Sequence, residues 1–330
     1  MTTPEISVIM PVLNEERHLA DAVRRVLEQQ YDGGIELLLA VGPSADRTHE
    51  IADELAAADP RITVLDNPTG LTPAGLNIAI RAARNEIVVR VDGHGELSDG
   101  YLATVARLLE ETGAANVGGL MDARGVSPVQ EAVAAAYNSP FGLGGGGFHL
   151  ADTPAGPAST VYLGAFRRSI LLKMGGYDET MHRAQDWELN HRLREAGHLV
   201  YFSPELRVTY WPRSSVSALA TQFYRTGQWR REVMRRHPET RSVRYLVPPV
   251  AVTGMAAGLL GGVVGLVTGR RLLSWLFLAP VLYLVFLVVA TLTMSVPSLS
   301  ARLRMPLVLA VMHVCWGAGF LRGVPRHVYA

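Results

Sequence analysis

Cysteine is almost absent from this sequence. A single cysteine, Cys315, occurs in 330 residues, which excludes an intramolecular disulfide and any zinc site that needs several cysteines. Glycine-rich phosphate loops are missing as well, since there is no GxGxxG and no Walker lysine. A diphosphate bound by this chain would therefore need a metal ion to hold it. The net charge of +1 gives no global field for a polyanion, so we expect no nucleic-acid partner.

Charge is also scarce in the last quarter of the chain. No Asp, Glu or Lys occurs from Leu246 to Phe320. Three apolar runs lie there, at about residues 247–268, 272–296 and 306–321. Because a membrane-spanning helix needs about 20 apolar residues, the first two runs predict spanning helices joined as an antiparallel hairpin. The third run is short and contains His313, so it predicts either a span or a re-entrant segment.

Basic residues precede the first apolar run. Beside a membrane helix they suit anionic headgroups on the cytoplasmic side, and the alternative is a solvated basic helix face. No N-terminal signal peptide is visible, so we expect a multi-pass protein of the cell membrane whose N-terminal domain is cytoplasmic. Arg270 and Arg271, in the turn of the hairpin, run against this orientation. The basic residues are Arg225, Arg230, Arg231, Arg235, Arg236, His237, Arg241 and Arg244.

The expected organisation has three parts. Residues 1–215 form the cytoplasmic domain, 216–245 a basic interfacial helix region, and 246–330 the membrane domain. Apolar strands alternate with helices in the first 120 residues, which predicts an α/β fold with parallel βαβ units. The expected strands are 6–10, 35–41, 62–65, 87–91, 117–122, 158–167, 199–202 and 208–211. The expected helices are 14–29, a segment ending at about 58, 72–83, 130–137, 170–174 and 187–196, with a glycine-rich loop at 139–147.

The first candidate site follows the strand at 87–91. This strand ends in Asp92, Gly93 and His94, where open α/β sheets bind ligands. A carboxylate and an imidazole two residues apart can share one divalent cation, which would hold a diphosphate. Asp and Gly also suit a plain turn, so both interpretations stay open on this segment alone.

The second candidate site surrounds Asp186. This residue stands at or just before a helix start, where an N-cap acid is common. Glu188, with Trp187 between the two acids and Arg183 before them, adds more polar chemistry than a cap requires. A carboxylate at this turn could deprotonate a hydroxyl nucleophile.

A third constellation lies just before the basic residues. On a helix, Gln222, Arg225 and Trp229 share one face. An amide, a guanidinium and an indole together make a platform for a sugar or a phosphate. The alternative is that Trp229 anchors an amphipathic interfacial helix.

Taken in order, these segments resemble the family 2 inverting glycosyltransferases of GT-A fold, over about residues 5–240. A narrower resemblance points to a membrane-attached branch of that family, in succinoglycan biosynthesis. The narrower resemblance is carried by residues 67–77, 91–94, 164–168 and 210–213. The broader one is carried by residues 11–16, 44–48, 92–94, 185–188 and 222–229.

The resemblance implies a role for each matching residue. It implies a nucleotide-sugar donor, most often UDP-linked, and a divalent cation, Mn²⁺ or Mg²⁺, held by Asp92 and His94. Asp186 matches the catalytic base. The implied acceptor contacts are Glu188, Gln222, Arg225 and Trp229. The implied donor contacts are Pro11, Leu13, Glu15, Gly42, Ser44, Asp46, Asn77 and Asp92.

The chain departs from the family pattern at three places. Val41 and Gly42 stand where the family usually has acids that contact the base, His94 replaces the last acid of the DxD motif, and Arg225 and Trp229 are not adjacent.

The membrane segments favour a lipid-linked or polysaccharide-precursor acceptor. A polyprenyl-phosphate glycosyl synthase, whose phosphate acceptor needs no base, is the alternative enzyme. A non-catalytic membrane subunit with a degenerate GT-A domain is the alternative from another class.

Overall fold

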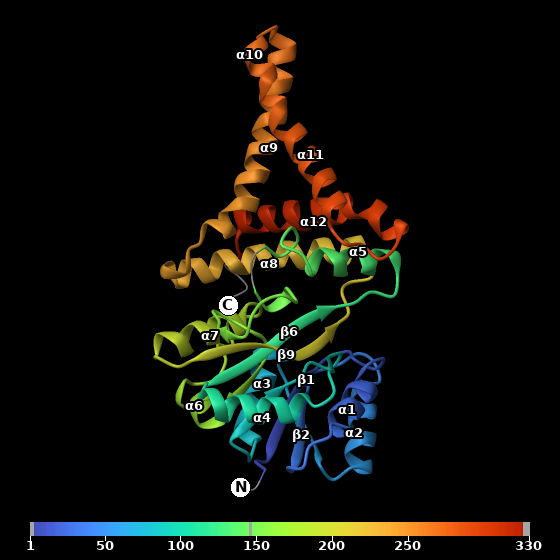
Figure 1. The fold of residues 1–330 in the computed structure, drawn as a ribbon, viewed down its shortest axis with the longest axis vertical. Coiled ribbons are helices and arrows are strands. Elements are labelled where there is room, and N and C mark those ends of the chain that lie inside the picture. Colours follow the sequence, from blue (N-terminus) through green and yellow to red (C-terminus); the bar gives the residue numbers. More distant parts are fainter. Residues whose placement is uncertain (1–2, 145–146, 326–330) are drawn as a thin grey trace. The chain divides into compact units, whose positions relative to one another are not determined.

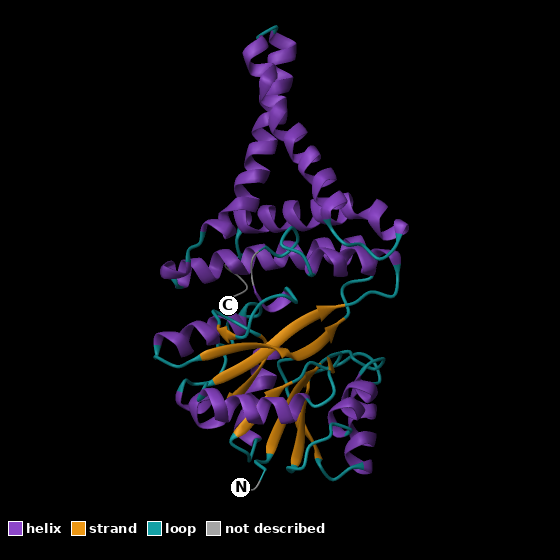
Figure 2. Ribbon diagram, in the orientation of Figure 1, coloured by secondary structure: helices purple, strands orange, loops and turns teal. Residues whose placement is uncertain are grey.

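The structure, a computed structural model, describes residues 3–144 and 147–325. Figures 1 and 2 show a sheet with helices and an all-helical part. The chain divides into two units. The first unit spans Met1–Asp122 and Gly147–Tyr210, and the second spans Ala123–Gly146 and Trp211–Ala330. The three-part organisation at 1–215, 216–245 and 246–330 stays a prediction.

One sheet runs through the first unit. Its order in the described residues is β3-β2-β1-β4-β8-β6-β9-β5, with β7 pairing with β9. As predicted, β1, β2, β3 and β4 are parallel, whereas β8 runs antiparallel to β4 and β6. The strands are β1 (Ile6–Val12), β2 (Ile35–Val41), β3 (Ile62–Asp66), β4 (Ile87–Arg90), β5 (Glu96–Leu97), β6 (Asn116–Ala123), β7 (Gly156–Pro157), β8 (Tyr162–Arg167) and β9 (Val200–Tyr210).

Helices cover both faces of this sheet. Leu19 and Val23 of α1, Ala52 of α2 and Leu102 of α4 pack on one face in one apolar core. Helices α3, α6 and α7 pack on the other face in a second core. Burial of the continuous apolar strands between these two layers is typical of a parallel sheet. The helices are α1 (Leu19–Leu27), α2 (Thr48–Ala58), α3 (Thr72–Ala82), α4 (Tyr101–Thr112), α6 (Arg168–Lys173) and α7 (Gln185–Glu195), with a 3₁₀ turn at Gly147–His149.

Several expected boundaries were wrong. Helix α1 begins at Leu19 rather than at residue 14, because the segment before it bonds to the loop after β2. The two strands expected at 199–202 and 208–211 are one strand, β9. The strand expected from 158 begins at Tyr162. Residues 145 and 146 of the expected glycine-rich loop lie outside the described residues.

The second unit is helical. Three helices in its described part are long and apolar enough to cross a membrane: Val243–Thr268, Arg271–Thr293 and Leu299–Arg322. The first two form a hairpin so tight that a Cβ on Gly265 would lie 2.5 Å from the backbone nitrogen of Ser274. The helices are α5 (Pro128–Tyr137), α8 (Val216–Arg236), α9 (Val243–Thr268), α10 (Arg271–Ser274), α11 (Leu278–Thr293) and α12 (Leu299–Arg322), with 3₁₀ turns at Pro238–Thr240 and Trp275–Phe277.

Candidate active site

Arg90 is a buried cation at the end of the central strand β4. Its side chain is 5% exposed, and its Nε donates a hydrogen bond to Oδ1 of Asp92 at 2.9 Å. Beyond the strand, the nitrogen of Val91 still donates to the carbonyl of Ile9, which fixes the start of the turn that carries Asp92. A buried charge is tolerated only when it is paired and hydrogen-bonded. Arg90 therefore holds Asp92 in place.

The same guanidinium also binds Asp186. Nη1 of Arg90 donates to Oδ1 of Asp186, in the first turn of helix α7. Residue 184, just before this helix, has a left-handed backbone with φ of 61°. The structure thus joins two of the predicted site residues, Asp92 and Asp186, through one arginine. The Asp186 side chain is 38% exposed and so is partly buried.

Opposing effects set the protonation of Asp186. Burial raises the pKa of its carboxyl, the Arg90 guanidinium lowers it, the nearby Asp92 carboxylate raises it, and the Tyr177 hydroxyl lowers it. The net pKa lies above the ordinary value of an aspartate. A carboxylate with a raised pKa is a stronger base, and Arg90 favours its ionised form.

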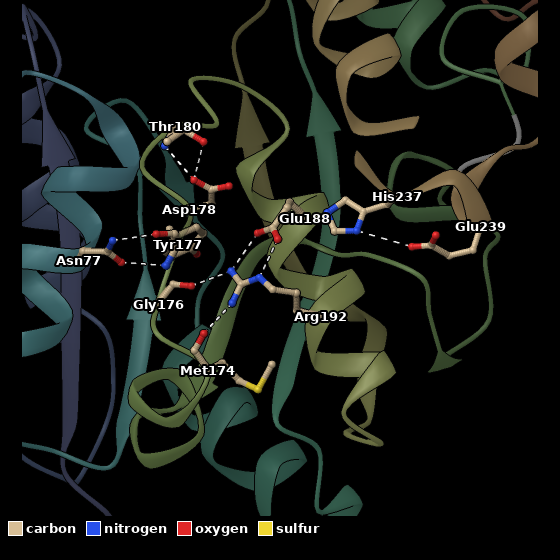
Figure 3. A network of polar contacts seen from close by, with 10 residues as sticks. All are labelled: Asn77, Met174, Gly176, Tyr177, Asp178, Thr180, Glu188, Arg192, His237 and Glu239. Carbon is tan, nitrogen blue, oxygen red and sulfur yellow. Dashed lines mark hydrogen bonds and ion pairs between the residues drawn. The ribbon is translucent and has the colours of Figure 1, made fainter. Parts of the chain in front are cut away.

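Tyr177 is placed beside this pair by Asn77. The Asn77 amide donates to the carbonyl of Tyr177 at 2.8 Å and accepts from its nitrogen at 2.8 Å (Figure 3). Gly176 has φ of 72°, and a Cβ there would lie 2.3 Å from Oδ1 of Asn77. Asn77 is buried and binds backbone, so the structure gives it a positioning contact; its role at the donor stays a prediction.

A second clamp holds the same loop. Glu188 is buried and binds Arg192 through both carboxylate oxygens, at 2.6 and 2.8 Å (Figure 3). Arg192 also donates to the carbonyls of Met174 and Gly176, each at 2.7 Å. Glu188 thereby fixes the segment that leads to Tyr177, and its role toward an acceptor stays a prediction.

His94 pairs with Glu15 across two loops. Nδ1 of His94 lies 2.8 Å from Oε1 of Glu15. A Cβ on the adjacent Gly93 would lie 3.1 Å from Cγ of Glu15, which is a tight contact. With Nδ1 protonated, the carboxylate orients the ring and places the lone pair on Nε2, an arrangement common among metal-ligating histidines. That Asp92 and His94 share a divalent cation stays a prediction.

The loops after β1 and β2 are bonded to each other. The nitrogen of Asn14 donates to Oγ of Ser44 at 3.0 Å, and that of Glu15 donates to Oγ1 of Thr48 at 2.8 Å. Asp46 accepts from the nitrogen of Glu16, and the Thr48 hydroxyl lowers the pKa of Asp46. Ser44 and Asp46 thus shape the edge where Pro11 and Leu13 lie. Their contact with a donor, like that of Pro11, Leu13 and Glu15, stays a prediction.

The backbone explains the missing acids at 41 and 42. Val41 is fully buried at the end of β2, so an acid there would lose its solvation. A Cβ on Gly42 would lie 2.9 Å from Cα of Gly70 and 3.2 Å from Cδ1 of Leu13. An acid would be desolvated at position 41 and would require the Gly70 loop to shift at position 42. Whether Gly42 contacts the donor stays a prediction.

Gln222, Arg225 and Trp229 lie on helix α8, as predicted, in the second unit. Arg225 is exposed, whereas Trp229 is 6% exposed and packs in the unit. Their role toward an acceptor stays a prediction.

The comparisons with known proteins agree with this architecture. The sequence profile of Glycosyl transferase family 2 matches residues 7–171, half of the chain. The chain belongs to glycosyl transferase family 2, and the GT-A fold predicted for it is confirmed.

Several known proteins are similar to this chain. The chain is 29% identical to the succinoglycan biosynthesis protein ExoA of Rhizobium meliloti (strain 1021), over 98% of this chain and 96% of that protein. Mannosyltransferase PcManGT from Pyrobaculum calidifontis, solved with GDP-Man and Mn²⁺, aligns with a TM-score of 0.56 at 18% identity, over 84% of this chain and 86% of that one. S. aureus TarS 1-349, solved with UDP-GlcNAc, aligns with a TM-score of 0.50 at 16% identity, over 70% and 66%. The two solved structures show likeness of fold.

The sequence did not predict that Arg90 and Tyr177 belong to the site. Arg90 interrupts the apolar run from Ile87 to Val91, and a cation inside a buried strand is a signal that it has a partner. Tyr177 carried no such signal, because its place beside Asp186 depends on the amide of Asn77, a hundred residues earlier.

Proposed function

We propose that this protein is an inverting glycosyltransferase that moves a sugar from a nucleotide-sugar donor to a lipid-linked or polysaccharide-precursor acceptor. The observation that carries this proposal is the bridge from Asp92 through Arg90 to Asp186. It sets a donor-side carboxylate and a basic carboxylate at the carboxyl edge of the parallel strands, the usual ligand edge of such sheets.

Asp186 is the proposed general base. Its carboxylate takes the proton of the acceptor hydroxyl while the oxygen attacks the anomeric carbon from the face opposite the diphosphate. The bond from sugar to diphosphate breaks, and the configuration inverts. General-base help of this kind contributes roughly 10²–10⁴-fold. The raised pKa of Asp186 suits that role.

Asp92 and His94 are the proposed ligands of a divalent cation, Mn²⁺ or Mg²⁺. When bound, such an ion stabilises negative charge on the departing diphosphate. Glu15 orients the imidazole of His94, and Arg90 holds the carboxylate of Asp92. The Mn²⁺ in the PcManGT structure supports this assignment.

The donor is proposed to carry UDP, as in the TarS structure, with GDP as in the PcManGT structure as the competing choice. The similarity to ExoA supports a place in polysaccharide biosynthesis. The candidate spans α9 and α11, with the basic residues before them, support a multi-pass protein of the cell membrane whose catalytic unit is cytoplasmic.

A thermal-shift panel on the full-length protein in detergent tests this proposal. UDP-, GDP- and dTDP-sugars are compared with and without Mn²⁺ or Mg²⁺. We expect one nucleotide class to raise Tm, and more so with the cation. No shift with any donor contradicts the proposal and favours the non-catalytic subunit.

A further inference from the structure

Helix α12 has two faces of different character. Exposed apolar residues recur along it at steps of four or seven positions, which places them on one face. They are Leu299, Leu303, Leu307, Val314 and Leu321, and we call this face the leucine stripe. The buried side chains lie on the opposite face and include Ala301, Met305, Val308, Leu309 and Met312.

The buried face of α12 lies against α8, and the two helices run side by side (Figure 1). Glycines allow close packing: a Cβ on Gly319 would lie 1.9 Å from the carbonyl oxygen of Tyr224, and a Cβ on Gly227 would lie 2.0 Å from that of Trp316. Nε2 of Gln228 donates to the carbonyl of Gly323 at 2.9 Å. Helix α12 is therefore fixed to α8.

Helix α8 is too polar to enter a bilayer. Arg225, Arg231 and Arg235 project from it as exposed residues, and Arg236 follows in the last turn. Charged side chains at the centre of a bilayer are expensive and rare unless they are paired inside a bundle or a water-filled cavity. Because α12 is bound to α8, it cannot cross the hydrocarbon without carrying these arginines into it.

The basic residues at the two ends of α12 also argue against a membrane-spanning helix. Arg302 and Arg304 lie in its first turns and Arg322 ends it. A spanning helix would put one of these ends on the far side of the membrane, whereas the positive-inside rule favours both on one side. Apolar side chains such as Leu282 and Leu284 are exposed on α11, as those of the leucine stripe are on α12.

We propose that α12 does not span the membrane but lies in its interface, with the leucine stripe toward the acyl chains and α8 at its back. The occupant of the stripe is the lipid bilayer, and the hairpin of α9 and α11 is then the membrane-crossing element. An amphipathic helix with a charged flank and an apolar face is suited to this position. The inference is independent of the transfer reaction.

Depth measurements test this placement. Cys315→Ser gives a background without cysteine, into which Leu303→Cys, Leu307→Cys and Val314→Cys are introduced singly in the full-length protein. Spin labels at these sites are placed by power saturation in vesicles of phosphatidylcholine and phosphatidylglycerol, with Leu284→Cys on α11 as the control. We expect the three α12 sites to share one depth of about 5–10 Å. A profile that descends to the midplane, about 15 Å from the surface of the hydrocarbon, overturns the proposal.

A second experiment tests on which side of the membrane the ends of α12 lie. In the Cys315→Ser background, Arg304→Cys and Arg322→Cys, both at exposed positions off the leucine stripe, and Leu272→Cys are treated separately with a membrane-impermeant maleimide in sealed inside-out vesicles from cells expressing the protein. We expect both α12 sites to react at once and Leu272→Cys to react only after detergent is added. Any other pattern overturns the proposal.

Discussion

One guanidinium nitrogen of Arg90 donates a hydrogen bond to Asp186, a residue 96 positions later in the chain. Nε of the same guanidinium donates a hydrogen bond to Asp92. Arg90 is thus the link between the proposed donor side and the proposed base, and its burial makes the link rigid. The first two predictions concern this link.

Arg90→Lys is expected to lower kcat about 100-fold, as misplacement of a catalytic group by about 1 Å does. Lysine keeps the charge but has no planar fork to bind two carboxylates. The measurement is steady-state transfer together with Tm. Arg107→Lys, at an exposed arginine paired with Glu111 and Glu205, is the matched control and should leave both unchanged. An Arg90→Lys enzyme of normal kcat would show that the bridge is structural only.

The pH profile gives a second prediction. Asp186 acts as a base only when ionised, and its pKa is raised, so activity falls on the acid side at a pH above the ordinary range of aspartate. Because Arg90 lowers this pKa, Arg90→Met should move the acid limb to higher pH. kcat measured against pH checks the shift, and an unchanged limb would remove Asp186 as the titrating group.

As the pH rises through the pKa of Asp186, stability should fall while activity rises. A carboxylate whose pKa is raised by folding contributes stability below its unfolded pKa and loses it as the pH rises through the folded value. The Tm of the wild-type protein should therefore fall as the pH rises through the pKa of Asp186, whereas Asp186→Asn, which cannot ionise, should lack this part of the pH dependence. Tm profiles of the two proteins that have the same dependence on pH would contradict this sign.

The proposed metal ligands give a fourth prediction. Imidazole is a softer ligand than carboxylate, so His94 should favour Mn²⁺ over Mg²⁺, and His94→Asp should reduce that preference. Glu15→Gln should weaken metal affinity by about 10–100-fold, since it orients the imidazole. Mn²⁺ and Mg²⁺ titrations of activity and of donor-dependent Tm measure both. If His94→Ala leaves metal dependence unchanged, His94 is not a ligand.

Gly42 allows a test of why the family's acids are missing. Gly42→Asp should lower stability by about 1–3 kcal/mol, the usual cost of overpacking, because its Cβ would meet Cα of Gly70. Gly254→Ala, at a glycine with no atom near its Cβ, is the control and should not destabilise. Thermal unfolding compares the two. A stable Gly42→Asp protein would show that this loop can yield.

Periodicity predicted the first half of the fold well. The runs at Ile35–Val41 and Thr72–Ala82 had clear apolar patterns, and both elements formed as expected. Periodicity failed where contacts between distant parts of the chain determine the secondary structure. Strand β9 was split in two because Ser203, Pro204 and Glu205 interrupt its apolar residues, although its backbone stays extended. Helix α4 and the two-residue strand β5 were not predicted.

Residue types indicated Asp92, His94 and Asp186 as candidates, because an imidazole follows the acid at the strand end and a second acid follows Asp186 in the same helix turn. Sequence could not show that Arg90 joins two of them, because that contact depends on the pairing of β4 and β8 and on the placement of α7. The bond between His94 and Glu15 is equally a consequence of two loops meeting. Such contacts arise from tertiary structure alone.

The role of Asp186 as the base is tested by Asp186→Asn, assayed for donor binding by calorimetry and for nucleoside diphosphate release in the presence of a lipid-linked saccharide extract. We predict an unchanged Kd for the donor and release slowed by at least about 100-fold. Full turnover by Asp186→Asn would contradict Asp186 as the base and favour an acceptor that needs none, such as a polyprenyl phosphate.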